Sequence, residues 1–289
     1  MPVGVYASAL TPQRPHAQRI DGGAALEIID FLNSSPVDGI LLLGGVGNFV
    51  HFDVEERERF TAFALKRSKK PVALNVSHST LEVTAHLAEH AAECGVRTIL
   101  AMPPYFYPYS EERVEAYFRA LRAAVPGRIS LFLYQLPHFT SRLTKEAAGR
   151  LLGEGLYAGI VDGAGEPGYL DELAGIRVLG NDAGWREARH QAHGFFSVCA
   201  AATPELVAAL DRALLEGNTE RVVLLEKHLS SLMLWLDRFP VPFGLMEAGR
   251  LRGLPLRPDA GWLAGAPLQE FREWFLAWLP GMVRDAKGK

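Results

Sequence analysis

Three short stretches carry residue types that could bind an anion and move a proton. Residues 44–48 read Gly-Gly-Val-Gly-Asn directly after an apolar run. Because glycine has no side chain, backbone N–H groups in such a loop can converge on a carboxylate, although a plain tight turn explains the same residues. Tyr134 ends a second apolar run, and its phenol can donate or accept a proton. Asp182 follows a third run and adds a carboxylate.

A further stretch of this kind carries no side chain that could do amine chemistry. Residues 157–165 (Tyr-Ala-Gly-Ile-Val-Asp-Gly-Ala-Gly) read as a buried strand that enters a second glycine-rich loop, with Val161 near its end. A lysine there could condense with a keto acid and act as an electron sink, which an isopropyl group cannot do. We therefore expect no desolvated Schiff-base lysine. The lysines all fall in expected helices, helix exits or the tail: Lys66, Lys69, Lys70, Lys145, Lys227, Lys287 and Lys289.

Histidines offer little support for a metal site. His86 and His90 lie four apart on an expected outer helix without the glutamate of a His-Glu-x-x-His motif, so we expect solvated or packed side chains. No Gly-x-Ser-x-Gly motif indicates a serine nucleophile. We expect no metal and no cofactor. The open alternative is a site formed with Asp182 by three histidines that each follow an expected strand, His51, His78 and His138.

Apolar runs alternate with amphipathic segments along the first 217 residues, and this alternation predicts a parallel sheet. Eight strands are expected, at residues 3–10, 39–43, 72–76, 98–101, 130–134, 158–161, 178–180 and 195–199. Asp53, Ser110, Thr144 and Thr203 are expected to cap the helices that follow them. The count favours closure into a (β/α)8 TIM barrel. A doubly wound open sheet is the alternative, but no Gly-x-Gly-x-x-Gly turn opens the first unit.

The strand pattern stops after about Gly217. Helices are expected at residues 219–236, 243–249 and 268–283, so we predict a barrel over 1–217 and a helical C-terminal region over 218–289 that packs on it. The tryptophans of this region are expected to bury against the barrel or a second subunit: Trp235, Trp262, Trp274 and Trp278.

Composition excludes several classes of partner. The 289 residues are 48% hydrophobic with a net charge of −3, which suits one large core. No basic patch interleaved with aromatic residues suggests nucleic acid, and no apolar stretch suggests a signal peptide or a membrane span. Cys94 and Cys199 lie far apart and read as buried thiols. We therefore expect a cytoplasmic protein without nucleic-acid or membrane partners.

The order of these motifs along the whole chain resembles the dihydrodipicolinate synthase / N-acetylneuraminate lyase family, which has the TIM-barrel fold. Residues 44–48 are similar to that family's G-T-T-G-E, residues 103–106 to P-P-Y-Y, and residues 134–137 to Y-N-x-P. Further matches are Leu10-Thr11-Pro12, Gly180-Asn181-Asp182 (S-G-D) and residues 194–201 around Phe196 (G-x-I-S-x-x-A-N).

The departures from this resemblance fall on reacting groups. Val161 occupies the lysine position of G-[IV]-K-[DE]-[SA]-[ST]-G. Phe106 replaces the relay tyrosine that crosses a subunit interface in the family, and Phe139 replaces an arginine that grips the substrate carboxylate. Tyr134 matches the tyrosine that donates and accepts protons there. In the glycine loop the two threonines and the acid are replaced by Gly45, Val46 and Asn48.

The resemblance implies a small 2-oxo acid such as pyruvate as ligand and a homodimer or homotetramer as assembly. Two hypotheses follow. The first is a binding protein that has lost Schiff-base catalysis and holds a small carboxylate or polar ligand at the barrel mouth. The second is an enzyme with altered, non-Schiff-base lyase or hydro-lyase chemistry, in which Tyr134 is the acid or base. The candidate ligand-binding residues are Gly44, Gly45, Val46, Gly47, Asn48, Phe106, Tyr134, Phe139, Val161, Asp182 and Phe196.

Overall fold

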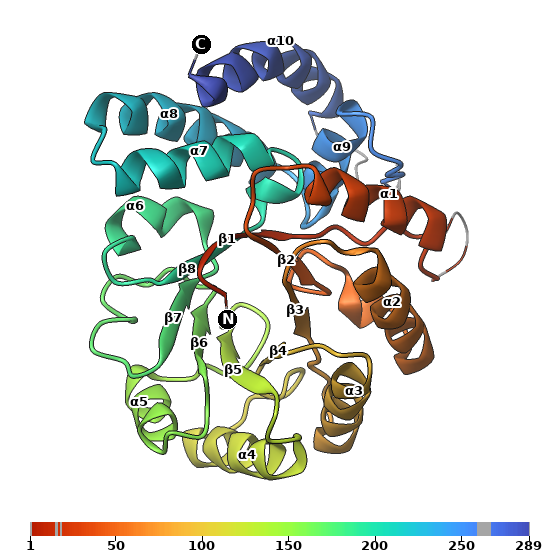
Figure 1. Cartoon of the computed structure of the whole chain (residues 1–289), viewed down its shortest axis with the longest axis vertical. Coiled ribbons are helices and arrows are strands. Elements are labelled where there is room, and N and C mark those ends of the chain that lie inside the picture. The colour runs from red at the N-terminus through yellow and green to blue at the C-terminus, as the bar shows by residue number, and fades with distance from the viewer. Residues whose placement is uncertain (1, 15–16, 18, 259–266, 289) are drawn as a thin grey trace.

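Eight parallel strands close into a barrel in the order in which they follow one another along the chain, in a computed structural model that describes residues 2–14, 17, 19–258 and 267–288. Figure 1 shows the strands at the centre and the helices around them. The TIM-barrel prediction is confirmed, and each predicted strand is present within a few residues. The strands are β1 (Gly4–Ser8), β2 (Gly39–Leu42), β3 (Val72–Asn75), β4 (Thr98–Ala101), β5 (Ser130–Gln135), β6 (Gly159–Asp162), β7 (Ile176–Leu179) and β8 (Gly194–Ser197).

The parallel register decides which side chains fill the barrel interior. Residues paired across neighbouring parallel strands point to the same face of the sheet. Tyr6 pairs with Phe196, and their rings meet edge to face at a centroid distance of 5.4 Å. Tyr134 pairs with Val161, which in turn pairs with Val178. All five side chains are buried, so the interior is a packed core and not a pore.

The outer layer consists of α1 (Gly22–Asn33), α2 (Val54–Arg67), α3 (Leu81–Glu93), α4 (Glu111–Ala124), α5 (Lys145–Gly153), α6 (Trp185–Ala188) and α7 (Pro204–Leu215). Two of the expected caps are confirmed, because Asp53 accepts the N–H of Glu56 and Thr144 accepts that of Ala147. Ser110 and Thr203 stand at N-caps without a side-chain cap bond.

The connection between β6 and β7 departs from the predicted strand–helix alternation. Residues 163–175 form turns and contain no helix. Gly165, Gly168 and Gly175 take positive φ angles there, and Pro167 removes a backbone donor, so this stretch cannot sustain a helical ladder. The next helix, α6, has only four residues.

After α7 the chain forms α8 (Thr219–Leu236), α9 (Phe243–Leu251) and α10 (Leu268–Lys287), which lie together on one side of the barrel in Figure 1. Trp274 stacks on Trp278 at 5.0 Å and contacts Trp235 at 5.6 Å. These three tryptophans pack against the core, whereas Trp262 lies outside the described residues. No helix in the described part of the chain is long and apolar enough to cross a membrane.

Candidate functional site

Val161 occupies a buried position on β6 at the carboxyl-terminal half of the barrel. Its side chain has no exposed surface, and it lies beside Tyr134 on β5 in parallel register. The described lysines are all outside the strands: Lys66 in α2, Lys69 and Lys70 in the loop before β3, Lys145 in α5, Lys227 in α8 and Lys287 in α10. No described amine is therefore placed on a strand of the barrel.

Tyr134 lies next to the glycine loop that follows β2. Burial raises the pKa of Tyr134 to about 12, and the adjacent backbone of Gly45 opposes that shift. A phenol with this pKa stays protonated near neutral pH. Tyr134 is therefore suited to donate a proton or a hydrogen bond, and poorly suited to act as a base.

The glycines of this loop serve packing as well as backbone geometry. A Cβ on Gly44 would lie 2.8 Å from Leu41 Cδ2, and a Cβ on Gly47 would lie 2.8 Å from the Cα of Leu43. The N–H of Gly47 donates to the carbonyl of Gly44 at 2.9 Å, which closes a tight turn. The N–H of Gly47 is thus used inside the protein. This part of the geometry favours the tight-turn reading over an open anion cradle. The rest of the loop places Val46 in the core and leaves Asn48 half-buried at φ 53°.

Leu136 completes the wall beside Tyr134, and no motif in the sequence singles it out. A Cβ on Gly45 would lie 3.6 Å from both Leu136 Cδ1 and the Tyr134 hydroxyl. A Cβ on Gly163 would lie 2.3 Å from Leu136 Cδ2, so Leu136 fills the space over that glycine. Gly45, Tyr134, Leu136 and Gly163 therefore form one continuous surface at the mouth, with Val161 next to it.

A buried polar network links the ends of β2, β3 and β4. Asn75 donates to the carbonyl of Leu43 at 2.7 Å and accepts from the Ser77 hydroxyl at 2.5 Å, and Ser77 Oγ accepts the N–H of Met102. Arg57 donates to the carbonyls of Ser77 and Asn75. Burial lowers the pKa of Arg57 to about 10, which still leaves it charged. The network links the rim through these bonds, while the Nε of Arg57 is buried without a hydrogen-bond partner.

Asp182 is buried, and its carboxylate is held by three donors. It accepts the Ser197 hydroxyl at 2.5 Å and the N–H groups of Val198 and Cys199 at 2.9 and 3.4 Å. Burial raises its pKa, and the bond from Ser197 opposes that shift. Asp182 therefore locks the loop after β7 to the end of β8.

The three histidines of the alternative site with Asp182 do not gather around its carboxylate. His78 Nδ1 lies 3.2 Å from the Thr80 hydroxyl, while His51 and His138 are exposed. Among residues 2–14, 17, 19–258 and 267–288, no group of three or more His, Cys, Asp or Glu could hold a metal ion. His86 pairs with Glu58 on the outer surface. Both cysteines are free; Cys199 is buried, but Cys94 is only half-buried, unlike the expectation.

Phe106 and Phe139 are exposed in one protomer, at 83% and 64%. Phe106 takes φ 85° and its ring contacts Tyr107 at 4.9 Å, so the loop presents both rings to the outside. Phe196, on β8, packs on Tyr6 inside the barrel. That Phe106, Phe139 and Phe196 contact a ligand stays a prediction.

Residues 1–261 match the model of the dihydrodipicolinate synthetase family. The chain belongs to this family. A 4-hydroxy-tetrahydrodipicolinate synthase of Kosmotoga olearia is 24% identical over 257 residues, covering 83% of this chain and 85% of the relative. A 2-dehydro-3-deoxy-D-gluconate/2-dehydro-3-deoxy-phosphogluconate aldolase of Picrophilus torridus is 28% identical over 145 residues, which is 50% of this chain and 53% of the relative.

Solved structures of dihydrodipicolinate synthetase family proteins share the fold. The dihydrodipicolinate synthase of Aquifex aeolicus superposes with a TM-score of 0.86 at 21% identity, covering 96% of this chain and 97% of that one. A family protein from Escherichia coli in complex with pyruvate gives a TM-score of 0.84 at 21% identity, covering 97% and 98%. At this identity the likeness concerns the fold alone.

The sequence singles out Tyr134, Val161 and the glycine loop as candidate site residues. It does not single out Leu136 or Asn75. Leu136 occupies the variable position of the Y-N-x-P motif, so the motif itself carries no signal for it. Asn75 lies within an apolar run that reads as a strand interior. A polar amide in such a run was the available signal, since a buried amide needs partners.

Proposed function

We propose that this chain is a lyase-family barrel that has lost Schiff-base catalysis and binds a small 2-oxo acid, or a related sugar acid, without a covalent bond. The observation that carries the proposal is the pairing of Val161 with Tyr134 inside the barrel. A Schiff base needs a deprotonated amine close to the bound keto acid. Val161 offers only methyl groups, and the described lysines lie in helices or in the loop before β3.

The ligand class follows from what remains at the mouth. The protonated phenol of Tyr134 can donate a hydrogen bond to a carbonyl or carboxylate oxygen, and Gly45 leaves space beside it. The half-buried Leu136 adds apolar surface that suits a short carbon chain, with the buried Val161 next to it. The names of the relatives supply the candidates, since they include a 2-dehydro-3-deoxy-D-gluconate aldolase and a structure in complex with pyruvate.

The alternative is an enzyme with non-Schiff-base lyase or hydro-lyase chemistry. It is favoured by one feature, the retention of a buried, protonated phenol at the mouth. In that reaction Tyr134 would give its proton to a leaving hydroxyl group. Its high pKa makes it a donor only, so the mechanism would need a separate base. Asp182 is held by Ser197 and backbone N–H groups and is not available in that arrangement.

Two measurements test the proposal together. Incubation with pyruvate and borohydride, followed by intact mass measurement, should show no reduced adduct. Thermal unfolding with pyruvate or 2-dehydro-3-deoxy-D-gluconate should show stabilisation, by about 2.7 kcal/mol when the ligand is at 100 times its Kd. Tyr134→Phe should weaken that stabilisation.

Opposite outcomes separate the hypotheses. An adduct mapped to a lysine inside the barrel would overturn the loss of Schiff-base chemistry. Equal stabilisation of the wild-type protein and Tyr134→Phe would move the ligand away from the mouth. Consumption of the sugar acid that is abolished in Tyr134→Phe would establish the enzymatic alternative.

A further inference from the structure

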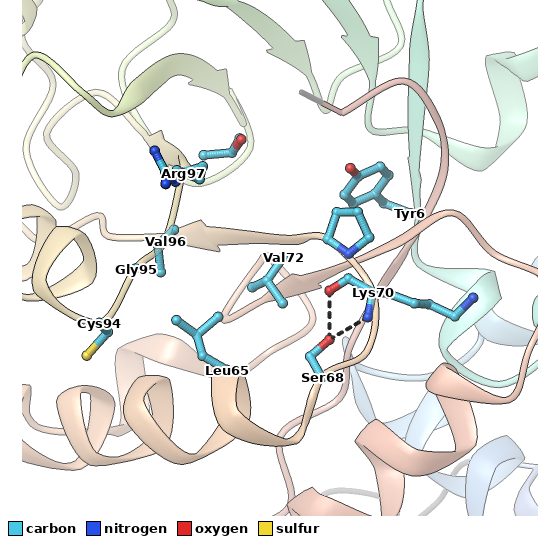
Figure 2. A pocket seen from close by; sticks show the side chains of 11 residues that line it. Tyr6, Leu65, Ser68, Lys70, Val72, Cys94, Gly95, Val96 and Arg97 are labelled. Atoms are coloured by element: carbon cyan, nitrogen blue, oxygen red, sulfur yellow. Dashed lines mark hydrogen bonds between the residues drawn. The ribbon is translucent and has the colours of Figure 1, made fainter.

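A second cavity lies at the opposite end of the barrel from the mouth. It opens where β3 begins at Val72 and β4 begins at Thr98, beside the loops that leave α2 and α3. Its volume is about 420 Å³, within the roughly 300–1,000 Å³ typical of small-molecule sites. Figure 2 shows the side chains that line it. Nothing in the proposed function of the mouth accounts for this cavity.

Tyr6 and Thr98 form the inner wall of the cavity. Both are almost fully buried, at 4% and 6% exposure, and both carry hydroxyl groups. A Cβ on Gly39 would lie 2.2 Å from Cε1 of Tyr6, so the ring occupies the place of any larger side chain there. Burial, and secondarily Asp38, raises the pKa of Tyr6, so the phenol stays neutral and able to donate.

The charged residues that line this cavity are all cationic. Lys70 and Arg97 lie on its lining, which includes no aspartate or glutamate. Figure 2 shows them on either side of Val72, with the Lys70 side chain directed away from Val72 and Arg97. The Lys70 ammonium donates to the carbonyl of Val37 at 2.6 Å, and two of its three protons remain for other acceptors. Burial, followed by Glu93 and Glu58, raises the pKa of the Cys94 thiol, so this lining residue adds no negative charge at neutral pH.

Apart from the hydroxyl of Ser68, which bonds to the backbone of Lys70, the rest of the lining is largely apolar. Leu65 and Val72 are half-buried, Val96 is buried, and Pro71 completes the surface. Such a combination accepts a molecule with a charged head and a hydrocarbon body, because the cations stabilise the anion and the aliphatic groups remove the body from water. A fully hydrated inorganic ion would leave the aliphatic part of the lining unused.

We propose that this cavity binds a small organic anion, with its carboxylate or phosphate group at Arg97, its apolar body against Leu65, Val72 and Val96, and Lys70 adding positive charge at the rim. The hydroxyls of Tyr6 and Thr98 donate hydrogen bonds from the inner wall. The site is separate from the barrel mouth, and the proposal does not depend on the function proposed for the mouth.

Titration calorimetry at low ionic strength tests the proposal with benzoate, phenyl phosphate and inorganic phosphate. Benzoate and phenyl phosphate should bind, and inorganic phosphate should bind at least tenfold more weakly because it has no apolar body. The double variant Lys70→Gln/Arg97→Gln should weaken binding on the order of tenfold, since each exposed ionic contact is worth only a modest factor. The preferred head group, carboxylate or phosphate, follows from which organic probe binds more tightly.

The control variant Arg113→Gln/Lys227→Gln removes the same charge from two exposed positions on α4 and α8 and should leave the affinity unchanged. Tyr134→Phe, which alters the mouth, should also have no effect. Three results would overturn the proposal: no binding of either organic probe, equal affinity in the two double variants, or equal affinity for benzoate and inorganic phosphate.

Discussion

The Tyr134 hydroxyl lies beside Gly45, where a Cβ would be 3.6 Å from the phenol oxygen, so the end of β5 meets the loop after β2 at this point. A hydroxyl-bearing residue at position 45 would stand next to the phenol, since a Cβ there meets only ordinary contact distances of 3.6 Å. The mouth therefore retains room for groups that this chain does not carry.

We predict that alanine changes the free energy of unfolding by different amounts at two glycines of the mouth. Gly45→Ala should change the free energy of unfolding by less than about 1 kcal/mol, because the new methyl group meets Tyr134 and Leu136 at 3.6 Å. Gly163→Ala should destabilise by about 1–3 kcal/mol, because its Cβ would lie 2.3 Å from Leu136 and 2.9 Å from the carbonyl of Gln135. Urea unfolding of both variants measures the difference. Equal effects would show that Leu136 does not fill the wall as described.

Val161→Lys alone should not restore lyase activity. The new amine would be buried against apolar neighbours, and desolvation would depress its pKa. Gly45, Phe106 and Phe139 would still leave proton transfer and carboxylate binding without side chains. Each missing acid–base contribution is worth roughly 10²- to 10⁴-fold in rate. Turnover of pyruvate with an aldehyde, assayed beside the wild-type chain, is the readout. Substantial activity in the single variant would refute the weight given to the other replacements.

The carboxyl of Asp162 makes stability depend on pH. Burial raises its pKa from 3.8 to about 6, although the N–H groups of Ala164 and Glu166 oppose the shift. Between these two pKa values the folded state binds more protons than the unfolded chain, so this group's contribution to stability falls as pH rises. Asp162→Asn keeps an acceptor and removes the titration. The unfolding free energy of Asp162→Asn minus that of the wild type should therefore rise by about 2 kcal/mol from pH 4.5 to pH 7.5. Urea unfolding at both pH values decides, and a relative stability that does not change with pH would contradict the prediction.

We predict a homodimer or homotetramer that depends on the loop around Phe106. Phe106, Tyr107, Tyr109 and Phe139 expose large aromatic surfaces on one protomer, between 37% and 83%. A patch of this kind is unfavourable in water and is relieved by association. Phe106→Asp should shift the assembly toward monomer, as measured by light scattering coupled to size exclusion. Leu234→Asp, at a 70% exposed position on α8, is the matched control. A wild-type monomer at micromolar concentration would refute the prediction.

The barrel itself could be predicted because its cause is local. The alternation of apolar runs with capped helices can be seen from residues that are adjacent in the sequence. Asp53 and Thr144 cap their helices as expected. The same prediction was wrong between β6 and β7. Regular alternation suggested a helix there, but glycines and a proline allow only turns.

The candidate site was only partly predictable, because its contacts are formed between distant segments. The pattern places Tyr134 and Val161 at strand ends, but it does not say that Leu136 covers Gly163 or that Asn75 bridges three strands. The direction of the Phe106 side chain depends on a φ angle of 85°, which no local residue pattern requires. Side-chain direction in loops is set by the tertiary structure around them.

The packing of Tyr6 against Phe196 has a consequence for how the two ends of the barrel can communicate. These rings, with the buried Val161 and Val178 beyond them, belong to a close-packed core between the two ends. A molecule held beneath Tyr6 is separated from one beside Tyr134 by this core. Binding at one end can therefore influence the other through a shift of the strands or through the field of its charge across the core. Any such influence must be reciprocal, with occupancy of either end changing the affinity of the other by the same factor.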